Sequence, residues 1–459
     1  MKITFSGIPD EIYAVQIPTP SLGDHTYLIV VDGEAAVVDP QLDLDRFEKQ
    51  IIESELNLKW VLDTHVHNDY VSGAKNLAER HGATYVLPFD SGATFEHSVI
   101  RDGESINLGR CQIRAAHTPG HTPHHMSYVL ELTNESEVDT KSIAVFSGGS
   151  MLVGAVGRTD LLGPELAEEL AYDQFRSVNR LAEHLPDPTT VGPTHGSGSF
   201  CSATPTGNDT VTTIGLEKTR NPALVSKNAD SFVSEQLAGY GLYPNYYANM
   251  GPLNRDGSAT SELVTPPNLS PHEITDHAAD SVLVDLRRNQ KFADGHIIGS
   301  INVPMSQDAG AYIGWVLPWD SNLILIADRQ RVIDDILLQL HRIGMTSIKG
   351  IVSDGLRAWK AEGRELSNYR VVTFHDMKVE QPENVLDARD PLEFNTRAIP
   401  NAVNVHFSQI SNEISNLGPG TIWIHCQSGY RASIAASQLA RFDRDVVLVN
   451  DAFQNALNQ

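Results

Sequence analysis

The sequence has few cysteines and no long apolar run. Only Cys111, Cys201 and Cys426 occur among 459 residues, and their separations suggest no disulfide framework, which fits a reducing compartment. No run of about 18 apolar residues could span a bilayer, and the N-terminal residues lack the apolar core of a secretory signal. The sequence therefore predicts a cytoplasmic protein that is not inserted in a membrane and has free thiols.

Positive charge is also scarce. The chain has 34 lysines and arginines against 58 acidic residues, a formal net charge of -24. Such a chain repels phosphate backbones and anionic membrane surfaces. Neither nucleic acid nor a membrane is therefore an expected partner. The 41% of hydrophobic residues is ordinary for a globular protein, and the length predicts about three domains.

The first part of the chain, residues 1–245, shows mixed α/β patterning. Two apolar strands at residues 27–31 and 35–39 flank Asp-Gly, which is typical of a type I′ hairpin. Residues 59–63 read as a buried strand and lead through a histidine-rich loop into a helix at residues 74–81. A longer helix is expected at residues 164–185. These alternating elements predict an α/β domain.

The second part of the chain contains an internal repeat after a predicted linker. Residues 246–272 are rich in Pro, Asn, Gly and Ser, which is typical of a linker. The motif Val284-Asp285-Leu286-Arg287 returns as Leu386-Asp387-Ala388-Arg389, with the following Phe and Asn at the same spacing. The repeat predicts two tandem copies of one small α/β domain with a parallel sheet, at residues 273–368 and 371–459.

The last copy carries the strongest candidate for a reactive sulfur. A predicted strand at residues 421–425 runs into the loop Cys426-Gln427-Ser428-Gly429-Tyr430-Arg431, which precedes a helical stretch. Amide groups in such a loop converge on an anion, and the helix dipole stabilises a thiolate or persulfide. Gly429 permits the tight loop, and Arg431 supplies positive charge. The alternatives are a buried structural cysteine and the similar CxxxxR loop of phosphatases.

The first copy lacks this sulfur. Its strand at residues 322–326 leads into Ala327-Asp328-Arg329, so Asp328 stands where the second copy has Cys426. Without a nucleophile, this copy is expected to act as a packing or docking module.

Histidine-rich loops mark a second candidate site. His65, His67 and Asp69 form a His-x-His-x-Asp loop directly after a strand, and His121 and His195 lie in later loops. This pattern predicts a metal site at one edge of an α/β sandwich, where imidazole suits zinc or iron. The alternative is a set of exposed or hydrogen-bonded histidines without a metal.

Taken in order, these motifs resemble the persulfide dioxygenases of the metallo-β-lactamase fold that are fused to rhodanese domains. The resemblance rests on residues 118–123, 156–160, 195–201 and 215–218 and on the repeated Asp-x-Arg and Asn-Val elements. It implies an αββα sandwich followed by two small rhodanese-like α/β domains with parallel sheets.

The resemblance also implies an activity. In that family one iron(II) per chain, held by two histidines and one aspartate, activates dioxygen and oxidises a persulfide to sulfite. The histidine positions fall on His65 and His121. Cys426, with Arg431, would move sulfur between a small-molecule persulfide or thiol and sulfite or thiosulfate. The expected enzyme is thus a rhodanese-type sulfurtransferase with persulfide dioxygenase activity.

Two positions depart from the family pattern. The loop Phe146-Ser147-Gly148-Gly149 places Gly149 where the carboxylate ligand belongs, and Tyr70 replaces the last histidine of the HxHxDH loop. His67 or a water is then the expected substitute ligand, with zinc as the alternative metal. One alternative function is a sulfurtransferase or sulfur carrier that has lost oxygenase activity. Another is a metal-dependent hydrolase.

The remaining candidates are expected around the metal or the substrate. Arg158 and Asp160 either orient the site or a thiol substrate, or they form a structural ion pair. Asp69 is expected behind the metal ligands, and His195 is expected as a hydrogen-bonding or substrate-side residue. Cys111 and Cys201 lack an activating context and are expected to be structural. Pairing of chains through a symmetric interface is a further expectation.

Overall fold

The computed structural model describes residues 1–133, 140–202 and 209–457. The chain forms two compact units. The first comprises Met1–Tyr240, Tyr247–Glu262 and Arg342–Gly344, and the second comprises Gly241–Tyr246, Leu263–His341 and Met345–Gln459. Within the described ranges, we find no helix that combines the length and apolar character needed to cross a membrane.

The first unit is built on two sheets. One has the order β1-β2-β3-β4-β5-β6-β7, and the other has the order β13-β12-β11-β10-β9-β8. The strands of the first sheet are β1 (Lys2–Thr4), β2 (Ile12–Thr19), β3 (Asp24–Val31), β4 (Glu34–Val38), β5 (Asn57–Leu62), β6 (Thr84–Pro88) and β7 (Ser98–Ile100). Those of the second are β8 (Ser105–Leu108), β9 (Cys111–His117), β10 (Met126–Thr133), β11 (Thr140–Gly148), β12 (Thr190–Pro193) and β13 (Thr212–Thr213).

The predicted hairpin and the predicted helix at residues 74–81 are confirmed. Strands β3 and β4 pair antiparallel with Val31 opposite Glu34, and both turn residues, Asp32 and Gly33, have positive φ, as a type I′ turn requires. Helix α2 (Ala74–His81) ends at Gly82, which adopts the left-handed conformation. Helix α1 (Asp45–Glu53) precedes β5, and β4 to β7 pair in parallel.

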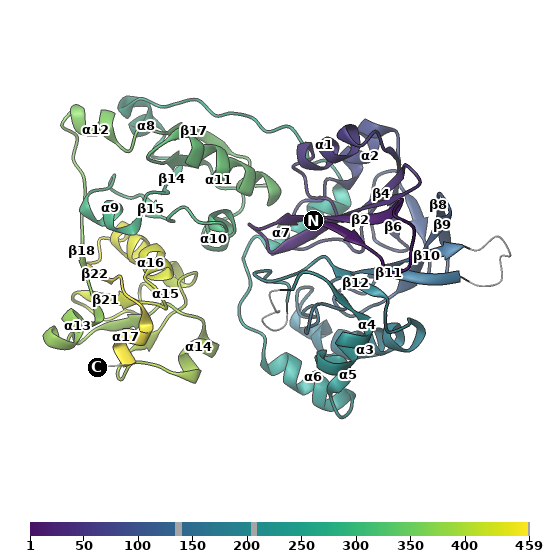
Figure 1. Cartoon of the computed structure of the whole chain (residues 1–459). Coiled ribbons are helices and arrows are strands. Elements are labelled where there is room, and N and C mark those ends of the chain that lie inside the picture. The colour runs from purple at the N-terminus through teal and green to yellow at the C-terminus, as the bar shows by residue number, and fades with distance from the viewer. Residues whose placement is uncertain (134–139, 203–208, 458–459) are drawn as a thin grey trace. The chain divides into compact units, whose positions relative to one another are not determined.

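Apolar side chains bind these elements into four layers (Figure 1). A central core, which includes Tyr27, Tyr128 and Phe146, contains residues of both sheets. A second core packs the first sheet against α1 and α2. A third packs the second sheet against a group of helices, namely α3 (Pro164–His184), α4 (Ile214–Arg220), α5 (Pro222–Val225) and α6 (Ala229–Ala238). The predicted αββα sandwich is therefore confirmed.

The segment expected as a linker is partly helical. Residues 247–256 form helix α7 (Tyr247–Asp256), in which Tyr247 and Met250 are buried. The Asn254 amide donates hydrogen bonds to the carbonyl oxygens of His67 (2.9 Å) and Tyr70 (2.8 Å). This part of the segment packs on the first unit because its apolar and amide side chains find partners there, which its Pro, Asn and Gly content did not indicate.

The second unit contains the two copies of the repeat, each with a parallel sheet. The first copy has the order β15-β14-β16-β17 and the second has β18-β22-β21-β19-β20. The strands are β14 (Val282–Asp285), β15 (Ile301–Asn302), β16 (Leu323–Ile326), β17 (Ile348–Val352), β18 (Arg370–Val372), β19 (Val385–Asp387), β20 (Val403–Asn404), β21 (Ile422–His425) and β22 (Val446–Val449). The helices are α8 (Pro271–His277), α9 (Asn289–Asp294), α10 (Ala309–Val316), α11 (Gln330–Arg342), α12 (Arg357–Ala361), α13 (Phe374–Glu380), α14 (Pro391–Thr396), α15 (Ile410–Glu413), α16 (Tyr430–Arg441) and α17 (Phe453–Leu457).

The repeated motif builds the same buried ion pair in both copies. Arg287 Nη2 lies 2.6 Å from Asp285 Oδ2, and Arg389 Nη2 lies 2.6 Å from Asp387 Oδ2. In each copy the arginine Nε contacts both carboxylate oxygens of its aspartate, at 2.9 and 3.0 Å. The shared spacing in the sequence thus reflects the same buried Asp–Arg ion pair in each small domain.

The two copies contact one another through helix α16. The Asn302 backbone N–H on β15 donates to Ser437 Oγ at 2.9 Å, and the Tyr430 hydroxyl donates to the Pro304 carbonyl oxygen at 2.9 Å. Helix α16 therefore packs directly on the first copy.

Candidate metal centre and sulfur loop

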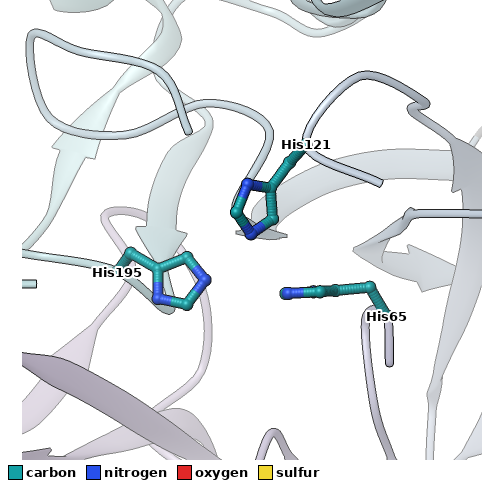
Figure 2. A group of neighbouring side chains, drawn as sticks. All are labelled: His65, His121 and His195. Atoms are coloured by element: carbon teal, nitrogen blue, oxygen red, sulfur yellow. The ribbon is translucent and has the colours of Figure 1, made fainter. Parts of the chain in front are cut away.

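Three histidines from three separate loops converge in the first unit. His65 follows β5, His121 lies between β9 and β10, and His195 follows β12. All three are at most 1% exposed. Ligand atoms of the three residues all lie within 4.8 Å of one another, and Figure 2 shows the three rings facing one another. This spacing is what a single metal ion needs.

Hydrogen bonds at the opposite ring nitrogen set the tautomers of His121 and His195. His121 Nδ1 lies 2.8 Å from the carbonyl oxygen of Arg158, and His195 Nδ1 lies 2.9 Å from Asp24 Oδ1. A carbonyl oxygen can only accept, so His121 Nδ1 carries the proton. His195 Nδ1 carries the proton when Asp24 is ionised, because a carboxylate only accepts. With these tautomers each Nε2 keeps a free lone pair.

The same reasoning applies to His65. Its Nδ1 lies 2.9 Å from Thr64 Oγ1, and that hydroxyl donates its own proton to Asp39 Oδ2 at 2.8 Å. The hydroxyl must then accept from His65, which leaves the Nε2 lone pair free. Among the described residues, none of the three histidine Nε2 atoms has a hydrogen-bond partner. Three buried lone pairs therefore point at one place.

Electrostatics keep these rings neutral. Burial and neighbouring histidines hold the pKa of His65 and of His121 well below the usual range, and burial lowers the pKa of His195. Neutral imidazole is the form that binds metal ions. The site is thus ready to accept a cation at neutral pH.

His67, the expected substitute ligand, is turned to other partners. Its Nε2 lies 3.1 Å from Asp39 Oδ1 and 2.9 Å from the Tyr70 hydroxyl. Burial alone would lower the pKa of His67, but the Asp39 carboxylate raises it to about 9. Two other groups of possible ligands include His67, one with Asp69 and His195 and one with Asp39 and Asp63. The group with His65 and His121 contains His195 instead.

The position of the missing carboxylate is closed by a histidine ring. A Cβ atom added to Gly149 would lie 2.3 Å from His121 Cδ2, far inside van der Waals contact. The Gly149 N–H donates to His125 Nε2 at 3.0 Å, which holds this backbone in place. A side chain at this position therefore requires His121 to move.

Two buried carboxyl groups lie behind His195. Asp24 Oδ1 and Asp69 Oδ2 are 2.9 and 3.4 Å from His195 Nδ1. Burial raises the pKa of Asp24 to about 7, and burial together with the charge of Asp24 raises the pKa of Asp69 to about 7. Asp69 and Asp24 thus both lie on the Nδ1 side of His195, and Asp24 is an addition that the motif did not contain. The expectation that Asp69 stands behind the metal ligands stays a prediction.

Arg158 and Asp160 form a two-point ion pair, with both N–O distances at 2.7 Å. The Arg158 backbone carbonyl holds the His121 ring, so this loop serves the histidine site as well. Burial raises the pKa of Cys111 to about 12 and that of Cys201 well above its usual value. Both thiols are neutral and buried, as a structural cysteine would be.

In the second unit, Cys426 lies between β21 and α16. The Gly429 N–H donates to Cys426 Sγ at 3.1 Å, so a backbone amide does point at the sulfur. Gly429 has φ of +90°, and a Cβ there would lie 2.1 Å from Asn450 Oδ1. The thiol is 1% exposed, and the neighbouring Gln427 and Ser428 are exposed. The sulfur atom of Cys426 is therefore largely covered by protein and faces a polar backbone group of its own loop.

The predicted cation of the loop has an acidic partner. Arg431 Nη2 lies 2.9 Å from Glu393 Oε1, and Nη1 contacts Glu393 Oε2 at 2.5 Å. Burial lowers the pKa of Arg431, but the Glu393 carboxylate raises it overall. The guanidinium is charged and held in a fixed orientation, with part of its charge balanced by Glu393.

The first copy contributes an aromatic cluster beside this loop. The Tyr312 ring on α10 lies 4.9 Å from the Tyr430 ring and 5.4 Å from the Phe407 ring, and Trp315 lies 5.2 Å from Phe407. Burial raises the pKa of Tyr312 to about 12, with a smaller contribution from the neighbouring Asp308 carboxylate. Sequence reasoning missed Tyr312 because nothing in the repeat signals which helix faces the loop.

Comparison with known proteins places these sites in context. The model of the metallo-beta-lactamase superfamily matches residues 22–134, and the model of the rhodanese-like domain matches residues 270–362 and 372–458. The chain is 30% identical over 225 residues to the mitochondrial persulfide dioxygenase ETHE1 of Bos taurus, covering 48% of this chain and 78% of the relative.

Two further matches extend the comparison. A hydroxyacylglutathione hydrolase of Francisella tularensis is 28% identical over 162 residues, which are 35% of this chain and 60% of the hydrolase. The crystal structure of a metallo-beta-lactamase from Staphylococcus aureus superposes with a TM-score of 0.66 at 27% identity, over 75% of this chain and 99% of that one. That match extends beyond the predicted first domain, residues 1–245.

Proposed function

Because this chain belongs to the metallo-beta-lactamase superfamily, in the family that includes the ETHE1 persulfide dioxygenases, and carries two rhodanese-like domains, we propose that it oxidises small-molecule persulfides and transfers their sulfur. The oxidation is assigned to the site at His65 and His121, and the transfer to Cys426. The observation that carries the proposal is the convergence of three free Nε2 lone pairs in one buried place.

The residues present fit a metal ion. Three neutral imidazoles suit iron or zinc, and a donor set of three leaves further positions for substrate. Iron(II) bound here would supply the activation of dioxygen. The histidines would hold the ion, their Nδ1 partners keep the rings in place, and burial would exclude bulk water from a bound substrate. The product assigned by the family resemblance is sulfite.

Sulfur transfer is assigned to the Cys426 loop. The Cys426 thiolate attacks the outer sulfur of thiosulfate, an S–S bond forms to Cys426, and sulfite leaves with the electron pair of the broken S–S bond. The resulting persulfide is an anion, and the Gly429 N–H lies in position to stabilise it. A second thiolate then takes the outer sulfur from Cys426, which returns the enzyme.

One experiment tests both halves. Purified full-length protein is assayed for iron and zinc content, for oxygen uptake on a glutathione persulfide, and for sulfur transfer from thiosulfate to a thiol. We expect about one iron per chain and oxygen uptake. Cys426→Ser should lose transfer and keep uptake, and His121→Ala should do the reverse. Transfer without bound metal or uptake would favour a sulfur carrier instead.

A second candidate function is hydrolysis. Three histidines with an open position are also a catalytic zinc set, and the chain matches a hydroxyacylglutathione hydrolase. Zinc-loaded and iron-loaded protein should therefore be compared on a glutathione thioester. Thioester hydrolysis by the zinc form, without oxygen uptake by the iron form, would replace the dioxygenase proposal.

A further inference from the structure

We propose that His195 takes the place of the missing aspartate as the third metal ligand, and that Asp24 and Asp69 supply the lost negative charge from behind this histidine. The inference rests on the proposed function only in requiring that the site binds a divalent metal ion. It differs from the family pattern of two histidines and one carboxylate, and it makes the ligand set three neutral imidazoles.

His195 and Gly149 follow two neighbouring strands, β12 and β11. Strand β11 ends at Gly148, next to the glycine that stands where the carboxylate belongs, and β12 runs parallel beside it with Gly148 opposite Pro193. The Thr194 N–H donates to the Gly148 carbonyl oxygen at 3.0 Å. The end of β12 therefore lies directly beside the end of β11, and His195 reaches the metal site from there.

The His121 ring leaves no room for a side chain at Gly149. A Cβ at Gly149 would lie 2.3 Å from His121 Cδ2 and 2.9 Å from its Nε2. The ring of His121 thus fills the space through which a carboxylate would have to reach the ion. His121 can therefore occupy its present position only because Gly149 has no side chain.

The carboxyl groups of Asp24 and Asp69 need a positive partner because both are buried. Asp24 and Asp69 are each 1% exposed. Among the ion pairs within residues 1–133, 140–202 and 209–457, their partner is His195 rather than a lysine or arginine. Buried carboxylates are normally paired with a cation or coordinate a metal. A divalent ion on the far side of the His195 ring supplies that cation.

The arrangement also has a defined effect on the ligand. A carboxylate that accepts the Nδ1–H of a histidine raises the basicity of the other ring nitrogen and fixes the ring. Asp24 does this for His195 at 2.9 Å. His65 and His121 have a hydroxyl and a carbonyl partner instead. His195 is therefore the ligand through which negative charge reaches the ion.

The test measures metal affinity in the full-length protein rather than activity. Metal-free protein is titrated with Zn²⁺ in competition with a chromophoric chelator, and Co²⁺ is added separately so that its visible spectrum reports the coordination. His195→Ala should abolish tight binding and change the Co²⁺ spectrum. Asp24→Asn and Asp69→Asn should each weaken Zn²⁺ binding by about 10–100-fold.

The matched control is Glu131→Gln. Glu131 is also buried, but its carboxylate binds Gln112 and Arg114 instead of His195, so its replacement should leave Zn²⁺ affinity nearly unchanged. Thermal unfolding of each metal-free variant checks that it folds. Gly149→Asp should bind Zn²⁺ no more tightly than the parent because His121 blocks the position.

The outcomes separate this inference from the proposed function. Unchanged Zn²⁺ affinity in His195→Ala, an equal loss in Asp24→Asn and Glu131→Gln, or tighter binding by Gly149→Asp would each overturn the inference. A wild-type protein that binds no divalent metal would overturn both. Metal binding that depends on His195 and Asp24, but without oxygen uptake, would support the inference and contradict only the dioxygenase activity.

Discussion

Gly429 holds the Cys426 loop in a conformation that other residues adopt only at a cost. Its φ is +90°, and a Cβ would collide with Asn450 Oδ1. Its N–H is the amide that reaches Cys426 Sγ. Backbone conformation, close packing and the sulfur contact therefore meet at one residue, so that any side chain at Gly429 disturbs all three.

Gly429→Ala should reduce sulfur transfer strongly and destabilise the second unit by about 1–3 kcal/mol. Gly363→Ala is the matched control because Gly363 also has positive φ, +66°, but a Cβ there meets nothing within 4 Å. Gly363→Ala should lower the free energy of unfolding only by the backbone strain and should leave sulfur transfer intact. Transfer from thiosulfate and urea unfolding measure the two effects, and equal losses in both variants would contradict the packing argument.

His425, directly before Cys426, should make the second unit acid-sensitive. Burial lowers the pKa of His425 to about 4, from 6.5 in the unfolded chain. As the pH falls through 6.5 the unfolded chain takes up this proton first, so stability present above pH 6.5 is lost progressively down to about pH 4. The loss should reach roughly 3 kcal/mol.

His425→Phe keeps a ring between Phe374 and Phe453 and removes the titrating group. Urea unfolding of this variant should depend less on pH between 6.5 and 4 than that of the parent, with little difference at pH 8. An unchanged slope would assign the acid sensitivity to another group.

At the scale of elements, helix α10 of the cysteine-free copy supports the sulfur loop of the other copy. Tyr312 packs against Tyr430 and Phe407, and Tyr430 in turn binds the Pro304 carbonyl oxygen. Helix α16 begins at Tyr430, so these contacts hold the start of the helix whose dipole faces the sulfur. The first copy thus has a structural part in the Cys426 site.

Tyr312→Ala should open the covered side of this loop. The cost in stability is on the order of 2 kcal/mol, and Cys426, now 1% exposed, should react faster with iodoacetamide. Tyr312→Phe keeps the ring and should label at the parent rate. Mass spectrometry of the labelled peptide distinguishes Cys426 from Cys111 and Cys201. Equal labelling of Cys426 in the parent, in Tyr312→Ala and in Tyr312→Phe would show that the Tyr312 ring does not cover the sulfur.

At the scale of the whole molecule, the two candidate sites belong to different units. His65, His121 and His195 lie in the first, and Cys426 lies with both rhodanese-like copies in the second. The α16 contacts with Asn302 and Pro304 join those two copies. We therefore expect sulfur transfer to depend on both copies but not on the first unit.

A fragment of residues 263–459 should fold and transfer sulfur from thiosulfate at a rate close to that of the whole chain. A fragment of residues 371–459 should be less stable because it exposes the face of α16 that packs on β15. Circular dichroism and the transfer assay compare the two. A fully active short fragment would contradict the role assigned to the first copy.

Local patterns predicted much of this molecule. The Asp32-Gly33 turn, helix α2 with its Gly82 end, and the repeated Asp285–Arg287 and Asp387–Arg389 pairs all depend on residues close together in the chain. His65 and His121 were predicted as members of the site by their motifs, and the structure brings them together. Helix α7 was missed because its Asn254 finds partners about 185 residues away, in the loop of His67 and Tyr70.

By itself the sequence determined which chemical groups are available: imidazoles, one thiol in a tight glycine loop, and a glycine where a carboxylate ligand would be. Only the tertiary structure decided which groups meet. Sequence proximity favoured His67 as the substitute ligand, but the Nε2 atom of His67 contacts Asp39 instead. Parallel pairing of β11 and β12 places His195 at the site. Metal sites depend on the direction of lone pairs in space, and that direction is set by strand packing rather than by separation along the chain.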